Sequence, residues 1–258
     1  PLPPAPASRR CRQLRRRLLV KAGGTADSVL LLYAGRLSPE KNPGLLIDML
    51  EHLNRPAQGE ARDYRLVLAG DGPMTESLLK DASRRARHRV LWLGAISDRA
   101  QLARYYASAD VFVHPNPREP FGIGPLEAMA SRVPLVLPSA GGVLSYANPA
   151  NAWLAEAAGE SFAHAVRSVV ARPDDARLAA AYEAARQHDG SRVAARFFRL
   201  YDDLHRRRQR LTSTERPGPF PLKSVSQAAR EFALPTTLSH RVVTGLGHSA
   251  LQESEVTE

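Results

Sequence analysis

The stretch from Asp110 to Ala130, DVFVHPNPREPFGIGPLEAMA, constrains the fold more than any other part of this chain. Its residues 111–113 form a short apolar run rich in β-branched side chains, which predicts a buried strand. Three prolines then exclude strand and helix alike, and apolar residues return at helical spacing from 126 to 130. The stretch therefore predicts a strand, a loop at its carboxyl end and a helix amino terminus, which is where open α/β sheets bind ligands.

Apolar runs and helical patterns alternate along the rest of the chain. Strands are expected at residues 29–33, 65–69, 90–93, 110–114, 133–138 and 152–154. Helices are expected at 43–53, from the loop at 70–73 to about 87, and at 98–108 with Ser97 as its N-cap. Further helices are expected at 159–171, 173–187 and up to about 210. This alternation predicts an α/β fold, a Rossmann-like parallel sheet with helices on both faces, followed by carboxyl-terminal helices.

Two glutamates lie within the first stretch, Glu119 in the loop and Glu127 eight positions later in the helix. With Pro-Phe-Gly after Glu119 and Leu-Glu-Ala-Met-Ala around Glu127, the stretch resembles the Glu-x7-Glu signature of retaining glycosyltransferases of the GT-B fold, family 4 or group 1. The resemblance covers about residues 25–210, essentially the donor-binding carboxyl-terminal half of such an enzyme. The alternative is an unrelated α/β domain whose glutamates lie on solvated faces.

The resemblance implies a role for each matching residue. Glu127 would hold the ribose of a nucleotide sugar and Glu119 would contact the transferred sugar. Arg36 and Lys41, which flank the first strand-to-helix loop, would hold the diphosphate in place of a metal, so the catalytic residues would be Glu119, Arg36 and Lys41. Backbone N–H groups at such loops suit anions. Other donor contacts would come from Gly35, Gly94, Ala95, Ile96, Phe121, Gly122, Ile123, Gly141 and Gly142.

No metal and no cofactor are expected. The chain has no Asp-x-Asp pair that would clamp a metal–diphosphate, and Cys11 is its only cysteine. His114, alone at a strand end, is expected to be a hydrogen-bonded structural residue. Family members often carry an acidic residue soon after the Gly-Gly pair, and this chain has Val143-Leu144-Ser145 instead, which leaves the sugar preference open.

The net charge of +10 is confined to two segments. Residues 1–21 hold seven basic residues and no acid, and residues 190–210 hold seven arginines against two aspartates, so the rest of the chain is slightly acidic. Aromatic residues do not interleave with the amino-terminal arginines, which argues against single-stranded nucleic-acid binding. No specific nucleic-acid partner is expected. Such segments also suit peripheral contact with an anionic membrane or contact with another domain, and most often they are solvated faces or linkers.

These observations predict three regions: a basic linker at 1–24 left from a missing amino-terminal half, a nucleotide-sugar-binding domain at 25–210 and a disordered tail at 211–258. The linker would include a short helix over 10–21. The expected function is retaining transfer of a hexose from a UDP-, GDP- or ADP-linked donor to an unknown acceptor in the cytoplasm, with the acceptor domain absent. The alternative is a non-catalytic nucleotide-sugar-binding or interaction module.

Overall fold

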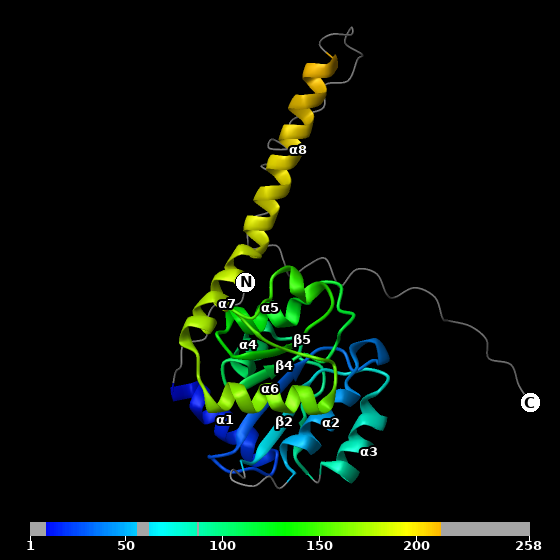
Figure 1. The fold of residues 1–258 in the computed structure, drawn as a ribbon, viewed down its shortest axis with the longest axis vertical. Coiled ribbons are helices and arrows are strands. Elements are labelled where there is room, and N and C mark those ends of the chain that lie inside the picture. The colour runs from blue at the N-terminus through cyan, green and yellow to red at the C-terminus, as the bar shows by residue number, and fades with distance from the viewer. Residues whose placement is uncertain (1–8, 56–61, 87, 213–258) are drawn as a thin grey trace, which may run out of the picture. The chain divides into compact units, whose positions relative to one another are not determined.

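Figure 1 shows the fold in a computed structural model, which describes residues 9–55, 62–86 and 88–212. The expected tail lies outside the described residues from 213 onward. The chain divides into two compact units between Gly190 and Ser191, and each unit is described by itself. This division lies about twenty residues before the expected end of the nucleotide-sugar-binding domain.

Six parallel strands form a single sheet in the first unit, in the order β3-β2-β1-β4-β5-β6. The strands are β1 (Val29–Ala34), β2 (Tyr64–Ala69), β3 (Val90–Trp92), β4 (Val111–Val113), β5 (Leu135–Pro138) and β6 (Trp153–Ala155). The order reverses direction between β1 and β4, and in open α/β sheets the ligand crevice lies outside the carboxyl ends of the strands at this point. The predicted fold class is confirmed.

Helices cover both faces of the sheet (Figure 1). One face packs against α2 (Gly44–Leu53), α3 (Thr75–Arg85) and α6 (Gly159–Ala171). The other packs against α1 (Arg9–Lys21), α4 (Arg99–Tyr106), α5 (Ile123–Ala130) and α7 (Asp175–Gln187). Two 3₁₀ turns, Pro39–Lys41 and Gly142–Ser145, lie in the loops after β1 and β5. The expected elements are therefore present, with ends that differ by a few residues.

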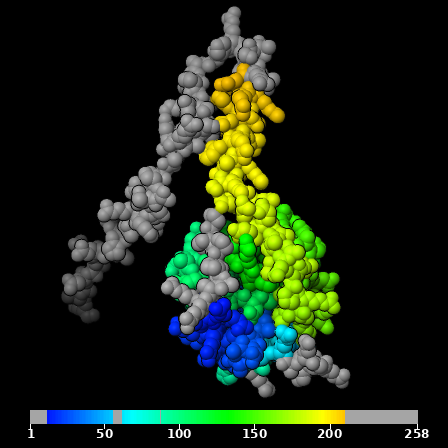
Figure 2. Space-filling view, turned by 90° about the vertical axis from the view of Figure 1, so that its left-hand side faces the viewer, coloured from blue at the N-terminus to red at the C-terminus, as the bar shows by residue number. Residues whose placement is uncertain are grey.

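The expectation of a linker at residues 1–24 is wrong for α1. Leu18 and Leu19 of this helix are buried against the sheet, and its Arg15 forms a 2.7 Å ion pair with Asp110. In Figure 2 the blue amino-terminal segment lies against the body of the first unit. A short helix over 10–21 was expected, but the sequence did not show that it would pack on the sheet.

A second correction concerns the start of α4. Its N-cap is Asp98, whose carboxylate accepts a hydrogen bond from the backbone N–H of Ala100 at 2.8 Å, and not Ser97. Both residue types are good N-caps, so their adjacency made the sequence ambiguous by one position.

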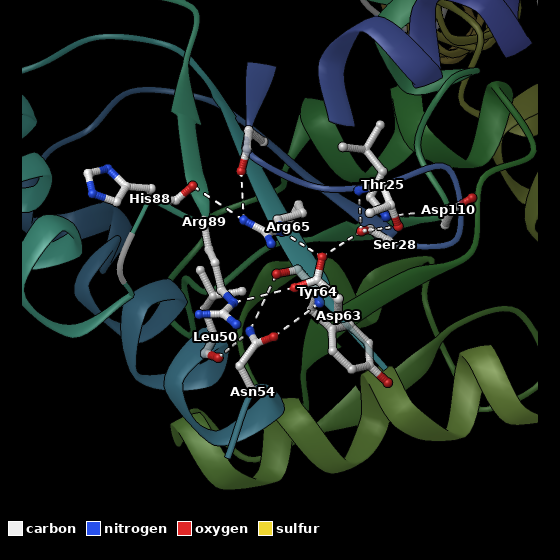
Figure 3. Close-up of polar contacts among 12 residues, drawn as sticks. Thr25, Ser28, Leu50, Asn54, Asp63, Tyr64, Arg65, His88, Arg89 and Asp110 are labelled. Carbon is white, nitrogen blue, oxygen red and sulfur yellow. Dashed lines mark hydrogen bonds and ion pairs between the residues drawn. The ribbon is translucent and has the colours of Figure 1, made fainter. Parts of the chain in front are cut away.

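Polar side chains fasten the amino ends of the strands, on the rim opposite the crevice (Figure 3). Asp63, just before β2, accepts hydrogen bonds from Ser28, just before β1, and from Arg65 of β2. Arg65 also donates to the carbonyl oxygen of Ala22, next to α1, at 2.9 Å. Asp110, before β4, accepts from the backbone N–H of Leu30 at 2.7 Å as well as from Arg15. These contacts join α1, β1, β2 and β4 at one end.

The described residues of the second unit, 191–212, all belong to one helix, α8 (Gly190–Thr212). The exposed apolar side chains of α8, which recur at helical spacing, are Phe197, Phe198, Leu200, Tyr201 and Leu204. The arginines at 192, 199 and 206 fall on the opposite side of an ideal helix. The expected closing helix is thus present, and its contact with a membrane or another domain stays a prediction.

Asp110→Ala should destabilise the first unit by about 2 kcal/mol, because it leaves the Leu30 N–H without an acceptor and Arg15 without its counter-ion. Asp27→Ala is the matched control, since Asp27 is exposed on the nearby loop. Thermal and urea unfolding measure both variants. Equal midpoints for the two would show that the Asp110 contacts contribute nothing.

Candidate functional site at the carboxyl rim of the sheet

A cavity of about 400 Å³ opens at the carboxyl ends of β1 and β2, beside the amino end of α5. We call it the rim cavity. Six of the residues expected to bind a donor line it: Gly35, Arg36, Ala95, Ile96, Ile123 and Glu127. They come from the three chain segments that follow β1, β3 and β4, so the parallel topology brings them together at one rim as the sequence predicted.

Arg36 is the cation of the rim cavity. It is exposed, and no hydrogen bond or ion pair of its side chain is found among the described residues. The hydroxyl of Tyr33 donates to the Arg36 carbonyl oxygen at 2.8 Å, which holds the backbone where the strand ends. The guanidinium can therefore meet an anionic ligand without first breaking another contact.

Glu127 lies in the first turns of α5 and faces the rim cavity. Burial raises the pKa of its carboxyl, while a hydrogen bond from the Tyr106 hydroxyl at 3.2 Å opposes that rise. A half-buried carboxylate that accepts one long hydrogen bond from the described side chains can accept further hydrogen bonds from ligand hydroxyl groups.

Glu119 and Lys41 lie in a separate group of polar residues, which we call the Glu119 cluster. It consists of the buried His114, Asn116 and Glu119 and the half-buried Lys41. One carboxylate oxygen of Glu119, Oε2, accepts hydrogen bonds from Lys41 Nζ at 2.7 Å and from Asn116 Nδ2 at 3.0 Å. Burial by itself would raise the pKa of Glu119, but the bonds from Lys41 and Asn116 outweigh burial and lower it. Two residues given separate ligand roles are thus bonded to each other.

His114 does not match its expected role as a hydrogen-bonded structural residue. It is 6% exposed, and neither ring nitrogen has a hydrogen-bond partner among the described residues. Its Nε2 lies 3.5 Å from Glu119 Oε2. Burial, with a smaller contribution from Lys41, lowers the pKa of His114 to about 4 against the attraction of Glu119, so the ring is neutral at pH 7.

The loop after Glu119 turns directly into α5. Gly122 is the N-cap of this helix with a φ of 87°, a left-handed conformation that favours glycine, and the Tyr146 hydroxyl donates to its carbonyl oxygen at 2.7 Å. The ring of Phe121, 42% exposed, packs edge-on against Tyr146. The Gly122–Ile123 backbone thus stands at a helix amino terminus, as expected.

Gly141 and Gly142 contact the protein's own backbone. A Cβ on Gly142 would lie 1.8 Å from the Pro120 carbonyl oxygen, and a Cβ on Gly141 would lie 2.7 Å from that of Pro117. The Gly142 N–H also donates to the Glu119 carbonyl oxygen at 2.7 Å. The pair therefore packs against the loop that carries Glu119, a role that the sequence did not show.

Gly94 does not line the rim cavity. Its carbonyl oxygen instead accepts a hydrogen bond from Gly70 N–H at 2.8 Å. Gly70 in turn packs so closely on Gly35 that a Cβ there would lie 1.8 Å from the Gly35 oxygen. The three loops after β1, β2 and β3 are thus held together by backbone contacts.

Sequence reasoning missed several lining residues of the rim cavity. Asp71, whose carboxylate accepts from Gly72 N–H and Thr75 Oγ1, follows β2 at the crevice end. That position at the end of a parallel strand was a usable signal. Tyr106 and Leu102 come from inside α4, where nothing in the sequence distinguished them from core residues.

The family comparison decides what kind of domain this is. Residues 17–188 match the family described as glycosyl transferases group 1. The chain belongs to this family. The expected resemblance is therefore confirmed, and the rim described above belongs to a group 1 glycosyltransferase domain.

Individual relatives agree with this assignment. The glycosyltransferase domain is 34% identical, over 72% of the chain, to a GDP-mannose-dependent alpha-(1-6)-phosphatidylinositol dimannoside mannosyltransferase of Mycobacterium tuberculosis, and covers 46% of it. It resembles Anabaena HepE, solved with UDP and glucose, at 26% identity and a TM-score of 0.56, over 69% of this chain and 47% of that one. The chain thus spans about half the length of these relatives.

A third similarity concerns the fold alone. The carboxyl-terminal domain of a group 1 glycosyltransferase of Francisella tularensis has 18% identity and a TM-score of 0.56 over 72% of this chain, and 94% of that domain is covered.

None of the helices in the described part of the glycosyltransferase is long and apolar enough to span a membrane.

Gly142→Ala should destabilise the first unit by about 1–3 kcal/mol, because the new methyl group forces the Pro120 carbonyl to move. Gly44→Ala, at the start of α2, is the control, since a Cβ there has no neighbour within 4 Å. Thermal unfolding compares the two. A Gly142 variant as stable as the Gly44 variant would show that the loop carrying Glu119 can move to accept the methyl group without loss of stability.

Proposed function

We propose that this chain is the donor-binding domain of a retaining hexosyltransferase that uses a nucleotide sugar and no metal. The observation that carries the proposal is the rim cavity, where the exposed Arg36, whose side chain has no partner among the described residues, and the half-buried Glu127 of α5 lie together. A nucleoside diphosphate has groups for each: hydroxyls for Glu127, and phosphates for Arg36 and the N–H groups at Ile123.

The donor is a UDP-, GDP- or ADP-linked hexose. The mannosyltransferase relative is named for GDP-mannose and HepE was solved with UDP and glucose, which supports a nucleotide-sugar ligand without choosing the base. The lining at Ala95 and Ile96 offers mostly backbone and apolar contacts to a base. A panel of three donors is therefore the appropriate test.

The chemistry follows from charge. Cleavage of the sugar–phosphate bond leaves negative charge on the diphosphate, and each cation or N–H donor aimed at it supplies about 2–4 kcal/mol of transition-state stabilisation. Arg36 and Lys41 are these cations in the proposal. Positive charge develops on the sugar ring, and the Glu119 carboxylate, kept ionised by its lowered pKa, stabilises it.

Transfer also needs a surface for the acceptor. We propose that an amino-terminal domain of the GT-B type supplies it and closes over the rim cavity, since such closure excludes water and completes the site. The fact that this chain covers only 46% of the mannosyltransferase supports a second domain. Binding of donor without transfer, even when that domain is added, would favour the alternative of a non-catalytic module.

Nucleoside diphosphates should bind this chain in the presence of a chelator, as measured by calorimetry. Arg36→Ala should weaken binding by about 1.5–3 kcal/mol, the range for charge-assisted hydrogen bonds. Arg172→Ala, an exposed arginine at the end of α6, is the control. Arg36 is a cleaner probe than Lys41, whose loss would also leave Glu119 without its cation. Unchanged affinity in Arg36→Ala would show that Arg36 does not bind the diphosphate.

The two glutamates should respond differently to the same ligands. Glu127→Ala should weaken nucleoside diphosphate and nucleotide sugar equally, by about 1.5–3 kcal/mol, because both contain the ribose. Glu119→Ala should leave the affinity for the nucleoside diphosphate unchanged or higher, since Lys41 no longer pairs with a carboxylate. It should lower the affinity for the nucleotide sugar relative to the affinity for the nucleoside diphosphate. Titration of both variants with both ligands decides this. If Glu119→Ala weakens nucleoside diphosphate as much as Glu127→Ala does, the roles are misassigned.

A further inference from the structure

His114 is a buried base whose ring has no hydrogen-bond partner among the described residues. It directly follows β4 and lies inside the Glu119 cluster. A buried polar group without a partner is costly, and it persists where another state of the protein uses it. A candidate partner is Glu119 Oε2, which lies 3.5 Å from His114 Nε2.

Three groups compete for that single carboxylate oxygen. Lys41 Nζ holds it at 2.7 Å, Asn116 Nδ2 holds it at 3.0 Å, and His114 stands just outside hydrogen-bond distance. A protonated His114 would place a second cation next to Lys41 in a buried site, so repulsion and burial together keep the ring neutral. Lys41 thus adds to the effect of burial in lowering the pKa of His114, against the attraction of Glu119.

The two tyrosines that interact with Glu119 do not supply a positive charge to balance its carboxylate. Tyr33 from β1 and Tyr146 from the loop after β5 both interact with Glu119, and burial raises the pKa of each phenol well above its ordinary value. They remain neutral hydroxyls over the physiological pH range. Lys41 and His114 are therefore the two groups in the described part of the cluster that can balance Glu119.

We propose that His114 takes up a proton from solvent when a diphosphate engages Lys41, and then replaces Lys41 as the cation that holds Glu119. The inference rests on the proposed function, in which Lys41 contacts the diphosphate. Phosphate oxygens draw Lys41 Nζ away from the carboxylate and cancel its charge, which leaves Glu119 with Asn116 alone. An imidazolium at Nε2 closes the 3.5 Å gap to a charge-assisted hydrogen bond.

The consequence is a positioning role for His114. Glu119 stays ionised and fixed in place for the sugar while Lys41 is used on the leaving group. Ligand binding and proton binding are thereby linked, so each favours the other. Between pH 7 and 6 the affinity of the unaltered chain for a nucleoside diphosphate should rise relative to a variant without this base, by up to about tenfold for one proton.

Calorimetry at about pH 6 tests the linkage, since an ordinary histidine titrates near this value and a depressed one does not. UDP and GDP are titrated in MES and in Bis-Tris, two buffers that differ in heat of ionisation, and the difference in binding heat gives the protons taken up. We expect roughly one proton more for the unaltered chain than for His114→Asn. His164→Asn, on the exposed surface of α6, should behave like the unaltered chain.

The possible outcomes separate the two proposals. If neither UDP nor GDP binds, and ADP titrated in the same way does not bind either, the proposed function fails. If both bind and His114→Asn takes up as many protons as the unaltered chain, His114 is not the acceptor and this inference is overturned while the proposed function stands. Should His114→Asn not fold, the ring resonances of ¹³C-labelled histidine in the unaltered chain decide: His114 must change from neutral to charged on saturation with UDP or GDP.

Discussion

The parallel ladder on both sides of β1 is the interaction on which the rest of the structure depends. Leu31 pairs with Leu66 of β2 and with Val111 of β4, so β1 is the centre of the sheet. Alternate side chains of β1 therefore enter opposite cores: Val29, Leu31 and Tyr33 pack with α2 and α6, and Leu30 and Leu32 pack with α1, α4 and α5. The same ladder fixes where Gly35 and Arg36 leave the sheet, directly beside the loop that follows β4.

The two glutamates of the signature lie in opposite electrostatic environments. Glu119 is surrounded by donors and a cation that lower its pKa, whereas burial raises the pKa of Glu127. Carboxylates whose surroundings push their pKa values apart commonly perform different tasks. A separation of eight residues produces this contrast because the chain crosses from a polar loop into a helix between them, and Gly122 makes the turn.

The sequence predicted the sheet well, because strands buried on both faces need apolar runs such as 29–33 that little else explains. It also predicted six residues of the rim cavity, because loops after parallel strands must meet at one edge. It did not predict the bond between Lys41 and Glu119, which are 78 residues apart and were each given to a ligand. Nor could it show that Gly142 packs on Pro120, since a close backbone contact across a fold leaves no local pattern.

The position of α1 has a consequence for the order in which the protein is made. Arg15 must wait for Asp110, which is synthesised 95 residues later, and at ribosomal speeds this takes roughly 5 to 20 seconds. A helix of 13 residues is marginal by itself in water, so α1 leaves the ribosome with Leu18 and Leu19 unprotected. Its arginines keep that nascent segment soluble during the delay, and they discourage association with neighbouring chains until β4 arrives.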